Sequence, residues 1–111
     1  MEEMRMNNDL KLIEERITML FKRRSKTRYW LQVVDDPYDR TYNFFFNSQR
    51  KWERQKSVPL HTIAQHDLSY LETIIVALQS FTQLTIQYDG FTGQRWPSSF
   101  QLIQRKRHHD E

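Results

Sequence analysis

The clearest pattern of apolar and polar positions lies between residues 68 and 81. Apolar side chains recur there at steps of three and four, so at about 3.6 residues per turn they form one stripe on a helix. The stripe consists of Leu68, Leu71, Ile74, Ile75, Leu78 and Phe81. Ser69 and Glu72 have the spacing of a capping box, and Asp67 is a competing N-cap. The pattern predicts an amphipathic helix that begins near residue 68.

The pattern changes from helical to alternating directly after this helix. From Leu84 to Tyr88, apolar and polar residues alternate, as they do in a half-buried strand. The next residues include Gly90 and Gly93, which are the only glycines in the chain. Because glycine adopts positive φ without a steric penalty, these residues favour a hairpin turn.

A second strand is predicted to return from this turn. It would cover Ser98–Ile103 and run antiparallel, with Phe100 and Leu102 facing the helix. Pro97 has no N–H to donate, so it suits the start of that strand or an edge of the sheet.

The beginning of the chain carries a second, narrower helical stripe. It consists of Leu10, Ile13, Ile17 and Leu20, and Asn8 or Asp9 could cap the helix. We interpret it as a helix packed on the sheet, with docking on a partner or on a second copy as the alternative. Residues 1–8 and 105–111 are polar, and we expect both segments to be flexible tails.

The middle of the chain alternates with the period of strands. Arg28–Val34 and Thr41–Ser48 are predicted to pair across a turn that contains Pro37. This alternation places Trp30 and Phe45 on the face away from the core. Arg50–Lys56 is a candidate for a short third strand, which residues 57–59 would end. Residues 60–65 would then form a connection, with a helical turn before the main helix.

These elements predict an α+β fold with an antiparallel sheet of four to five strands and two helices, in the order α-β-β-(β)-α-β-β. The chain of 111 residues is long enough for one domain and too short for two. It shows no linker or repeat, so we expect residues 1–111 to form a single compact domain.

Composition narrows the class of protein. The chain has no cysteine and no apolar run of membrane-spanning length, which favours an intracellular protein, cytoplasmic or nuclear, without a membrane partner. Aromatic residues reach 14% and the net charge is +3. A mildly basic protein of this kind permits an anionic partner.

The cations are clustered rather than spread. Three segments, residues 22–28, 50–56 and 105–107, hold 12 of the 17 lysines and arginines. Each lies near an aromatic residue: Tyr29 and Trp30 for the first, Trp52 for the second, and Phe100, further back, for the third. Cations neutralise phosphates, and aromatic rings stack on unpaired bases. We therefore predict a small nucleic-acid-binding module for single-stranded or distorted DNA or RNA. Its expected contact residues are Arg23, Arg24, Lys26, Arg28, Trp30, Arg50, Lys51, Trp52, Arg54 and Lys56.

A protein-interaction module, such as an adaptor, subunit or inhibitor, is the alternative. Arginine and tryptophan are enriched at interaction hot spots, and the loop with Phe91, Arg95 and Trp96 could be an exposed tip. The aromatic content of so small a domain also favours a homodimer. Binding that weakens with salt would support nucleic acid, and binding that is insensitive to salt would support a protein partner.

The chain offers little for catalysis. Asp35, Asp36 and Asp39 crowd one turn, but they lack the spacing and glycine of a calcium loop and are ordinary turn residues beside a proline. His61 and His66 are five residues apart, which does not place them on one helical face. No phosphate-binding glycine motif is present. We expect no catalytic residue, no metal site and no cofactor, and hence no enzyme.

Overall fold

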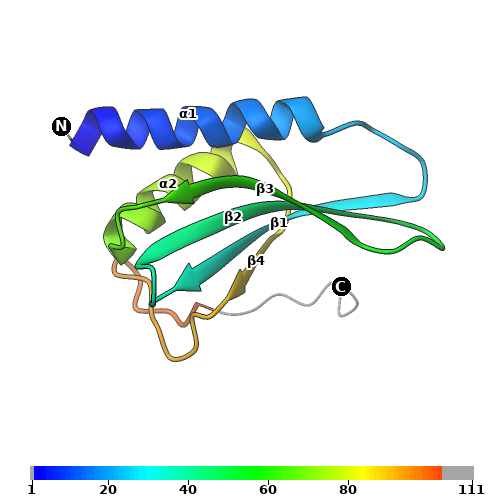
Figure 1. Cartoon of the computed structure of the whole chain (residues 1–111). Helices are drawn as coiled ribbons and strands as arrows, with labels where there is room; N and C mark the ends of the chain where they lie inside the picture. The colour runs from blue at the N-terminus through cyan, green and yellow to red at the C-terminus, as the bar shows by residue number, and fades with distance from the viewer. Residues whose placement is uncertain (1, 104–111) are drawn as a thin grey trace.

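The computed structural model describes residues 2–103, with side chains from Asn8 onward (Figure 1). The predicted tail at 105–111 and the third basic cluster lie outside the described residues. The elements are α1 Glu2–Leu20, β1 Thr27–Asp36, β2 Thr41–Arg50, β3 Lys56–Ile63, α2 Leu68–Phe81 and β4 Ile86–Asp89. Within the described residues, no helix combines the length and the apolarity needed to cross a membrane.

The four strands form one sheet in the order β3-β2-β1-β4, and α1 and α2 lie on the same side of it (Figure 1). This confirms the α+β class, the two helices and the approximate element order. The sheet is mixed, however, because β4 pairs parallel to β1 while β1, β2 and β3 pair antiparallel. The prediction of a purely antiparallel sheet is therefore wrong. A helix between β3 and β4 carries the chain back along the sheet, so β4 runs in the same direction as β3 and β1.

The predicted return strand at residues 98–103 does not form. Among the described residues, its one ladder contact is a single bridge between Arg95 and Leu102. Phe100 has a positive φ of 60° and is 73% exposed, so it does not face the helix. Leu102 is 46% exposed, and Ile103 enters the core instead. The segment after β4 turns too tightly for a strand, because its backbone passes through three residues with positive φ.

The predicted third strand is displaced along the chain. Residues 51–55 form the turn between β2 and β3, where Trp52 has a φ of 73° and the Glu53 N–H donates to the Arg50 carbonyl oxygen at 2.9 Å. The strand itself begins at Lys56 and includes most of the segment expected to be a connection. Pro59 does not end it, because β3 is an edge strand where a missing N–H is tolerated.

A β-bulge in this strand explains how α1 is attached. The pairing of β2 with β3 shifts between Phe44 and Phe45, so Leu60 and His61 both face the helices. Leu60 enters the core, and its carbonyl oxygen accepts a hydrogen bond from the Arg16 guanidinium of α1. The bulge therefore supplies both an apolar contact and a polar contact to the helix.

Of the predicted caps, only Asp67 occupies the N-cap position, at the start of α2, and its side chain makes no capping hydrogen bond. The helix α1 begins at Glu2, so Asn8 and Asp9 lie inside it and do not cap it. Asp9 instead accepts hydrogen bonds from His61 at 2.7 Å and from the Tyr70 hydroxyl of α2. The helix α2 spans the predicted stripe, but Glu72 accepts from Ser98 rather than forming a capping box.

The core lies between the helices and one face of the sheet. Its buried side chains come from both helices, all four strands and the C-terminal loop, and include Ile13, Leu31, Val33, Tyr42, Phe44, Leu60, Ile63, Leu71, Ile74 and Leu78. The predicted core residues Leu71, Ile74, Ile75, Leu78 and Ile86 are buried. The apolar stripe of α1 also packs within the chain, since Ile13 and Ile17 are buried.

The opposite face of the sheet carries a chain of polar side chains. Ser57 Oγ donates to Asn47 Oδ1 at 2.6 Å, and Asn47 Nδ2 donates to Gln32 Oε1 at 2.9 Å. Gln32 Nε2 donates to Asp89 Oδ2 at 2.6 Å, and Gln87 donates to the same oxygen at 2.8 Å. These hydrogen bonds connect all four strands, so they support the register of the whole sheet.

We expect truncation of Leu78 to destabilise the protein strongly. Leu78→Ala should lower the free energy of unfolding by about 2–5 kcal/mol, through lost apolar transfer energy and the cavity left behind. The matched control is Val76→Ala on the same helix, because Val76 is 57% exposed and its truncation leaves no cavity. Urea unfolding compares the two variants. Equal destabilisation by both would contradict the packing described for α2.

The two glycines provide a second matched pair. Both have positive φ, so alanine at either position should cost about 1–2 kcal/mol in backbone strain. A Cβ on Gly90 would also lie 2.8 Å from the Asp35 carbonyl oxygen, whereas a Cβ on Gly93 would meet nothing within 4 Å. Gly90→Ala should therefore lower the thermal melting temperature clearly more than Gly93→Ala. An equal decrease in melting temperature for both variants would show that the Asp35 backbone moves away from the added Cβ at no energetic cost.

Candidate nucleic-acid interface

Two basic segments that are far apart in sequence meet at one end of the sheet. In the ladder of β1 with β2, Thr27 lies opposite Arg50, and the Lys51 N–H donates to the Lys26 carbonyl oxygen at 2.8 Å. The residues at 22–28 and 50–56 therefore form one surface, which we call the basic end. It contains nine lysines and arginines and one carboxylate, on a chain whose net charge is +3. The charge is thus concentrated at this end.

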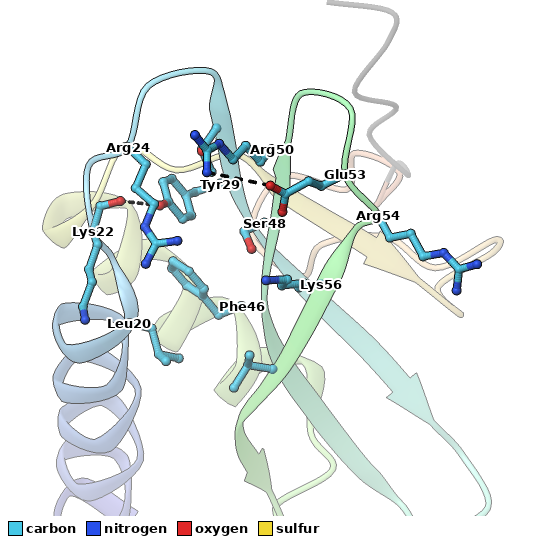
Figure 2. Close-up of a pocket in the computed structure, with 12 residues that line it drawn as sticks. Leu20, Lys22, Arg24, Tyr29, Phe46, Ser48, Arg50, Glu53, Arg54 and Lys56 are labelled. Atoms are coloured by element: carbon cyan, nitrogen blue, oxygen red, sulfur yellow. Dashed lines mark hydrogen bonds and ion pairs between the residues drawn. The ribbon is translucent and has the colours of Figure 1, made fainter.

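A pocket of about 160 Å³ opens on the helix side of the basic end (Figure 2). We call it the helix-side pocket. It is lined by Leu20, Lys22, Arg24, Thr27, Tyr29, Phe46, Ser48, Arg50, Glu53, Arg54, Lys56 and Val58. Strand register explains its floor: one cross-strand row is Tyr29, Ser48 and Lys56, and the adjacent row includes Phe46 and Val58. The floor is therefore largely apolar, and the rim is cationic.

Aromatic contacts hold the loop that forms one wall of the pocket. The Tyr29 hydroxyl donates to the Lys22 carbonyl oxygen. The Tyr29 ring lies 4.8 Å from the Phe21 ring and 5.5 Å from the Phe46 ring, measured between centroids. These contacts fix the segment after α1 against the sheet, so Arg24 is carried on a supported loop.

The cations of the pocket differ in orientation. Figure 2 shows Arg24 and Lys56 directed into the space over Phe46, from opposite walls. Arg50 lies at the upper rim and pairs with Glu53 at 3.7 Å. Lys22 and Arg54 point away from the centre of the pocket. Arg24 and Lys56 are therefore the cations placed to contact a group inside it.

A groove of about 470 Å³ lies on the other face of the basic end, and we call it the outer-face groove. It is lined by Lys26, Thr27, Arg28, Gln49, Arg50, Lys51 and Trp52. Trp52 is 90% exposed, and the Lys51 ammonium lies 5.3 Å from the centre of its ring. An exposed tryptophan with cations around it offers a stacking surface that is already in a positive field.

The structure brings eight of the ten predicted contact residues around the two hollows, and Arg23 and Trp30 are the exceptions. Arg23 is exposed at the basic end but lines neither hollow. Trp30 lies on the outer face, as the alternation predicted, but only 2% of its surface is exposed. Its Nε1 donates to Gln87 Oε1 at 3.2 Å. Trp30 therefore has no free ring face for a base.

The alternative site is not an exposed tip. Phe91 is only 2% exposed, and its ring lies 5.9 Å from Tyr42 and 5.8 Å from Tyr88. Trp96 is half-buried and packs edge-on against Tyr88 at 5.5 Å. Arg95 is exposed and donates to the Phe100 carbonyl oxygen at 2.7 Å. The prediction that Phe91 is exposed is wrong, because the loop folds back over the end of β1 and β2.

Sequence reasoning did not select the residues that form the pocket floor. The alternation along β1 and β2 places Tyr29 and Phe46 on the core face, and Ser48 shares the parity of Phe46 along β2. The sequence does contain an indication of this floor, because apolar side chains that continue along a strand beyond the end of the helices must reach solvent. The sequence does not determine where α1 ends relative to β2, and hence which apolar side chains border the opening.

Two contacts between a histidine and a carboxylate were also not predicted from the sequence. His66 Nε2 lies 2.6 Å from Asp35 Oδ1, and Gln94 donates to the other Asp35 oxygen at 2.8 Å. His61 makes the similar contact with Asp9 already described. Each pair joins segments distant in sequence, so both cross-link the fold. In the part of the chain that is described, no three His, Asp or Glu residues are grouped to hold a metal ion.

Neither the family models, nor the curated proteins, nor the solved structures give a match to this chain.

We expect the stability of the protein to fall at alkaline pH because of two tyrosines. Burial, followed by the carboxylates of Asp35 and Asp67, raises the pKa of Tyr42 from 10.0 to about 12. Burial raises the pKa of Tyr88 to about 12 as well. Below pH 10.0 both phenols are neutral whether the chain is folded or unfolded. Between pH 10.0 and about 12 these two phenols ionise only in the unfolded chain. The free energy of unfolding therefore decreases as the pH rises through this range.

The ultraviolet absorbance of tyrosinate, together with urea midpoints across that range, measures the effect. Tyr42→Phe should remove part of the tyrosine ionisation that the folded protein shows near pH 12, and it should make the urea midpoint less dependent on pH. Tyr38→Phe is the control, because Tyr38 is 97% exposed and the variant also lacks one tyrosine. If Tyr42→Phe and Tyr38→Phe gave identical pH profiles, Tyr42 would not be the group responsible.

Proposed function

We propose that this protein is a small nucleic-acid-binding module that contacts its ligand through the basic end. The observation that carries the proposal is the meeting of residues 22–28 with residues 50–56 at one end of the sheet. Nine cations and one carboxylate in one place produce a local positive potential that the net charge of +3 does not reveal. Such a surface matches the regular negative charge of a phosphate backbone.

The two faces of the basic end support contacts of different kinds. Lys26, Arg28 and Lys51 border the outer-face groove and are exposed, so they are suited to backbone phosphates. Trp52 projects beside them and is suited to stacking on an unpaired base. Trp30 is not among the proposed stacking residues, because it is buried. The arrangement favours a single-stranded or locally unpaired ligand over an intact duplex.

A protein-interaction module is the second candidate, and it rests on a different observation. An apolar groove lies between the ends of the two helices and is lined by Ile17, Thr18, Phe21, Phe81, Thr82, Gln83 and Leu84. Phe81 in its lining and Met19 beside it are exposed. Exposed apolar groups in one place are a feature of protein interfaces, including those of homodimers. This groove replaces the loop at Phe91 as the basis for that candidate.

The first candidate predicts strongly salt-dependent binding. Affinity for a labelled oligonucleotide should fall steeply between about 50 and 200 mM salt, because each phosphate contact releases counterions. Lys51→Ala with Arg54→Ala should weaken binding to all sequences alike and flatten the salt dependence. Arg40→Asn is the matched control: Arg40 lies in the turn at the other end of the β1–β2 hairpin, and asparagine tolerates its positive φ.

Trp52→Ala separates stacking from phosphate contact in the same assay. It should cost about 1–3 kcal/mol on a single strand and much less on a duplex of the same sequence. Fluorescence anisotropy with both forms measures the difference. If neither form binds at about 50 mM salt with tens of micromolar protein, the nucleic-acid proposal fails and the protein-interaction candidate takes its place.

A further inference from the structure

We propose that the helix-side pocket binds the terminal phosphate of a nucleic-acid strand, a phosphomonoester, in preference to an internal phosphodiester. This inference rests on the proposed function and identifies the part of the ligand that the pocket would hold. It is carried by the arrangement of Arg24 and Lys56, which are directed from opposite walls into one space over Phe46 (Figure 2).

The pocket brings three kinds of donor to this space. Arg24 supplies a planar guanidinium, which can donate two parallel hydrogen bonds to phosphate oxygens. Lys56 supplies an ammonium, and Ser48 lies beside it in the cross-strand row and supplies a hydroxyl. A terminal phosphate presents three acceptor oxygens, whereas a diester uses one of those positions to continue the chain. Three separate donors therefore suit the terminal group better.

The charge of the pocket points to the same ligand. A phosphomonoester carries about −1.5 to −2 at neutral pH, and a diester carries a single charge. Within the described residues, neither Arg24 nor Lys56 has a carboxylate partner, and the one acidic residue of the lining, Glu53, pairs with Arg50. The two cations directed into the pocket are thus free to balance a doubly charged group.

The shape of the pocket suits the end of a strand rather than its middle. Leu20, Phe46 and Val58 contribute an apolar floor and wall, so a backbone entering the pocket would meet uncharged side chains at its base. The pocket, at about 160 Å³, is also smaller than the outer-face groove at about 470 Å³. A strand whose terminal phosphate is held in the pocket could continue across the rim, past Arg50, toward Trp52 on the other face.

The test uses one single-stranded oligonucleotide sequence in three forms: with a 5′-phosphate, with a 3′-phosphate, and with hydroxyls at both ends. All three carry the same internal fluorophore, and anisotropy is measured with the full chain at one ionic strength. We expect one phosphorylated form to bind about tenfold more tightly than the hydroxyl form, which corresponds to about one charge-assisted hydrogen bond. The preferred form identifies which end of the strand enters the pocket.

Variants connect the preference to the pocket. Arg24→Gln combined with Lys56→Gln should reduce the tenfold preference to near unity while leaving weaker binding of all three forms. Lys26→Gln combined with Lys51→Gln, on the outer-face groove, should weaken all three forms and keep the preference. All four side chains are exposed, and thermal unfolding followed by circular dichroism verifies that each variant is folded.

The outcomes separate this inference from the proposed function. Equal affinity for the three forms would overturn the inference and leave nucleic-acid binding in place. A preference that survives Arg24→Gln with Lys56→Gln would place the terminal phosphate elsewhere and would also overturn it. If no form bound at all, the proposed function would fail, and the inference that depends on it would fail with it.

Discussion

The antiparallel pairing of β1 with β2 is the constraint on which the rest of the structure depends. Its ten-residue register places Thr27 opposite Arg50 at one end and Asp36 opposite Thr41 at the other. Because side chains alternate along both strands, the same register determines which residues face the helices. A shift by one residue would exchange the two faces, so the core and the position of the basic end are specified together.

Much of this arrangement could be predicted, because local periodicity determines the elements and their faces. The stripe in α2 and the alternation in β1 and β2 are local patterns, and both are found in the structure. The missed features depend on contacts between distant segments. Pro59 resembles the end of a strand unless the strand is known to be an edge. Phe91 resembles an exposed loop residue unless the loop is known to fold over Tyr42. The convergence of the two basic segments could be inferred only once their strands were paired.

The basic end has an energetic cost that the rest of the fold must offset. Nine cations at one end repel one another in the folded state, and the described residues place a single carboxylate, Glu53, among them. Solvent screens much of this repulsion, since the side chains are exposed. The buried core and the histidine–carboxylate contacts of Asp9 and Asp35 lie elsewhere and stabilise the fold independently of it. A ligand that neutralised the basic end would remove the repulsion and raise the stability of the whole domain.

The polar chain on the outer face also has a direction. A carboxylate only accepts, so the Asp89 side chain requires the amide nitrogens of Gln32 and Gln87 to point toward it. Gln32 then presents its oxygen to Asn47, and Asn47 presents its oxygen to Ser57. Every amide dipole in the row is therefore aligned by one charge on the far strand. The sheet therefore carries a one-way polarity, from the Ser57 hydroxyl beside Lys56 to the Asp89 carboxylate, which joins the border of the basic end to the opposite edge strand.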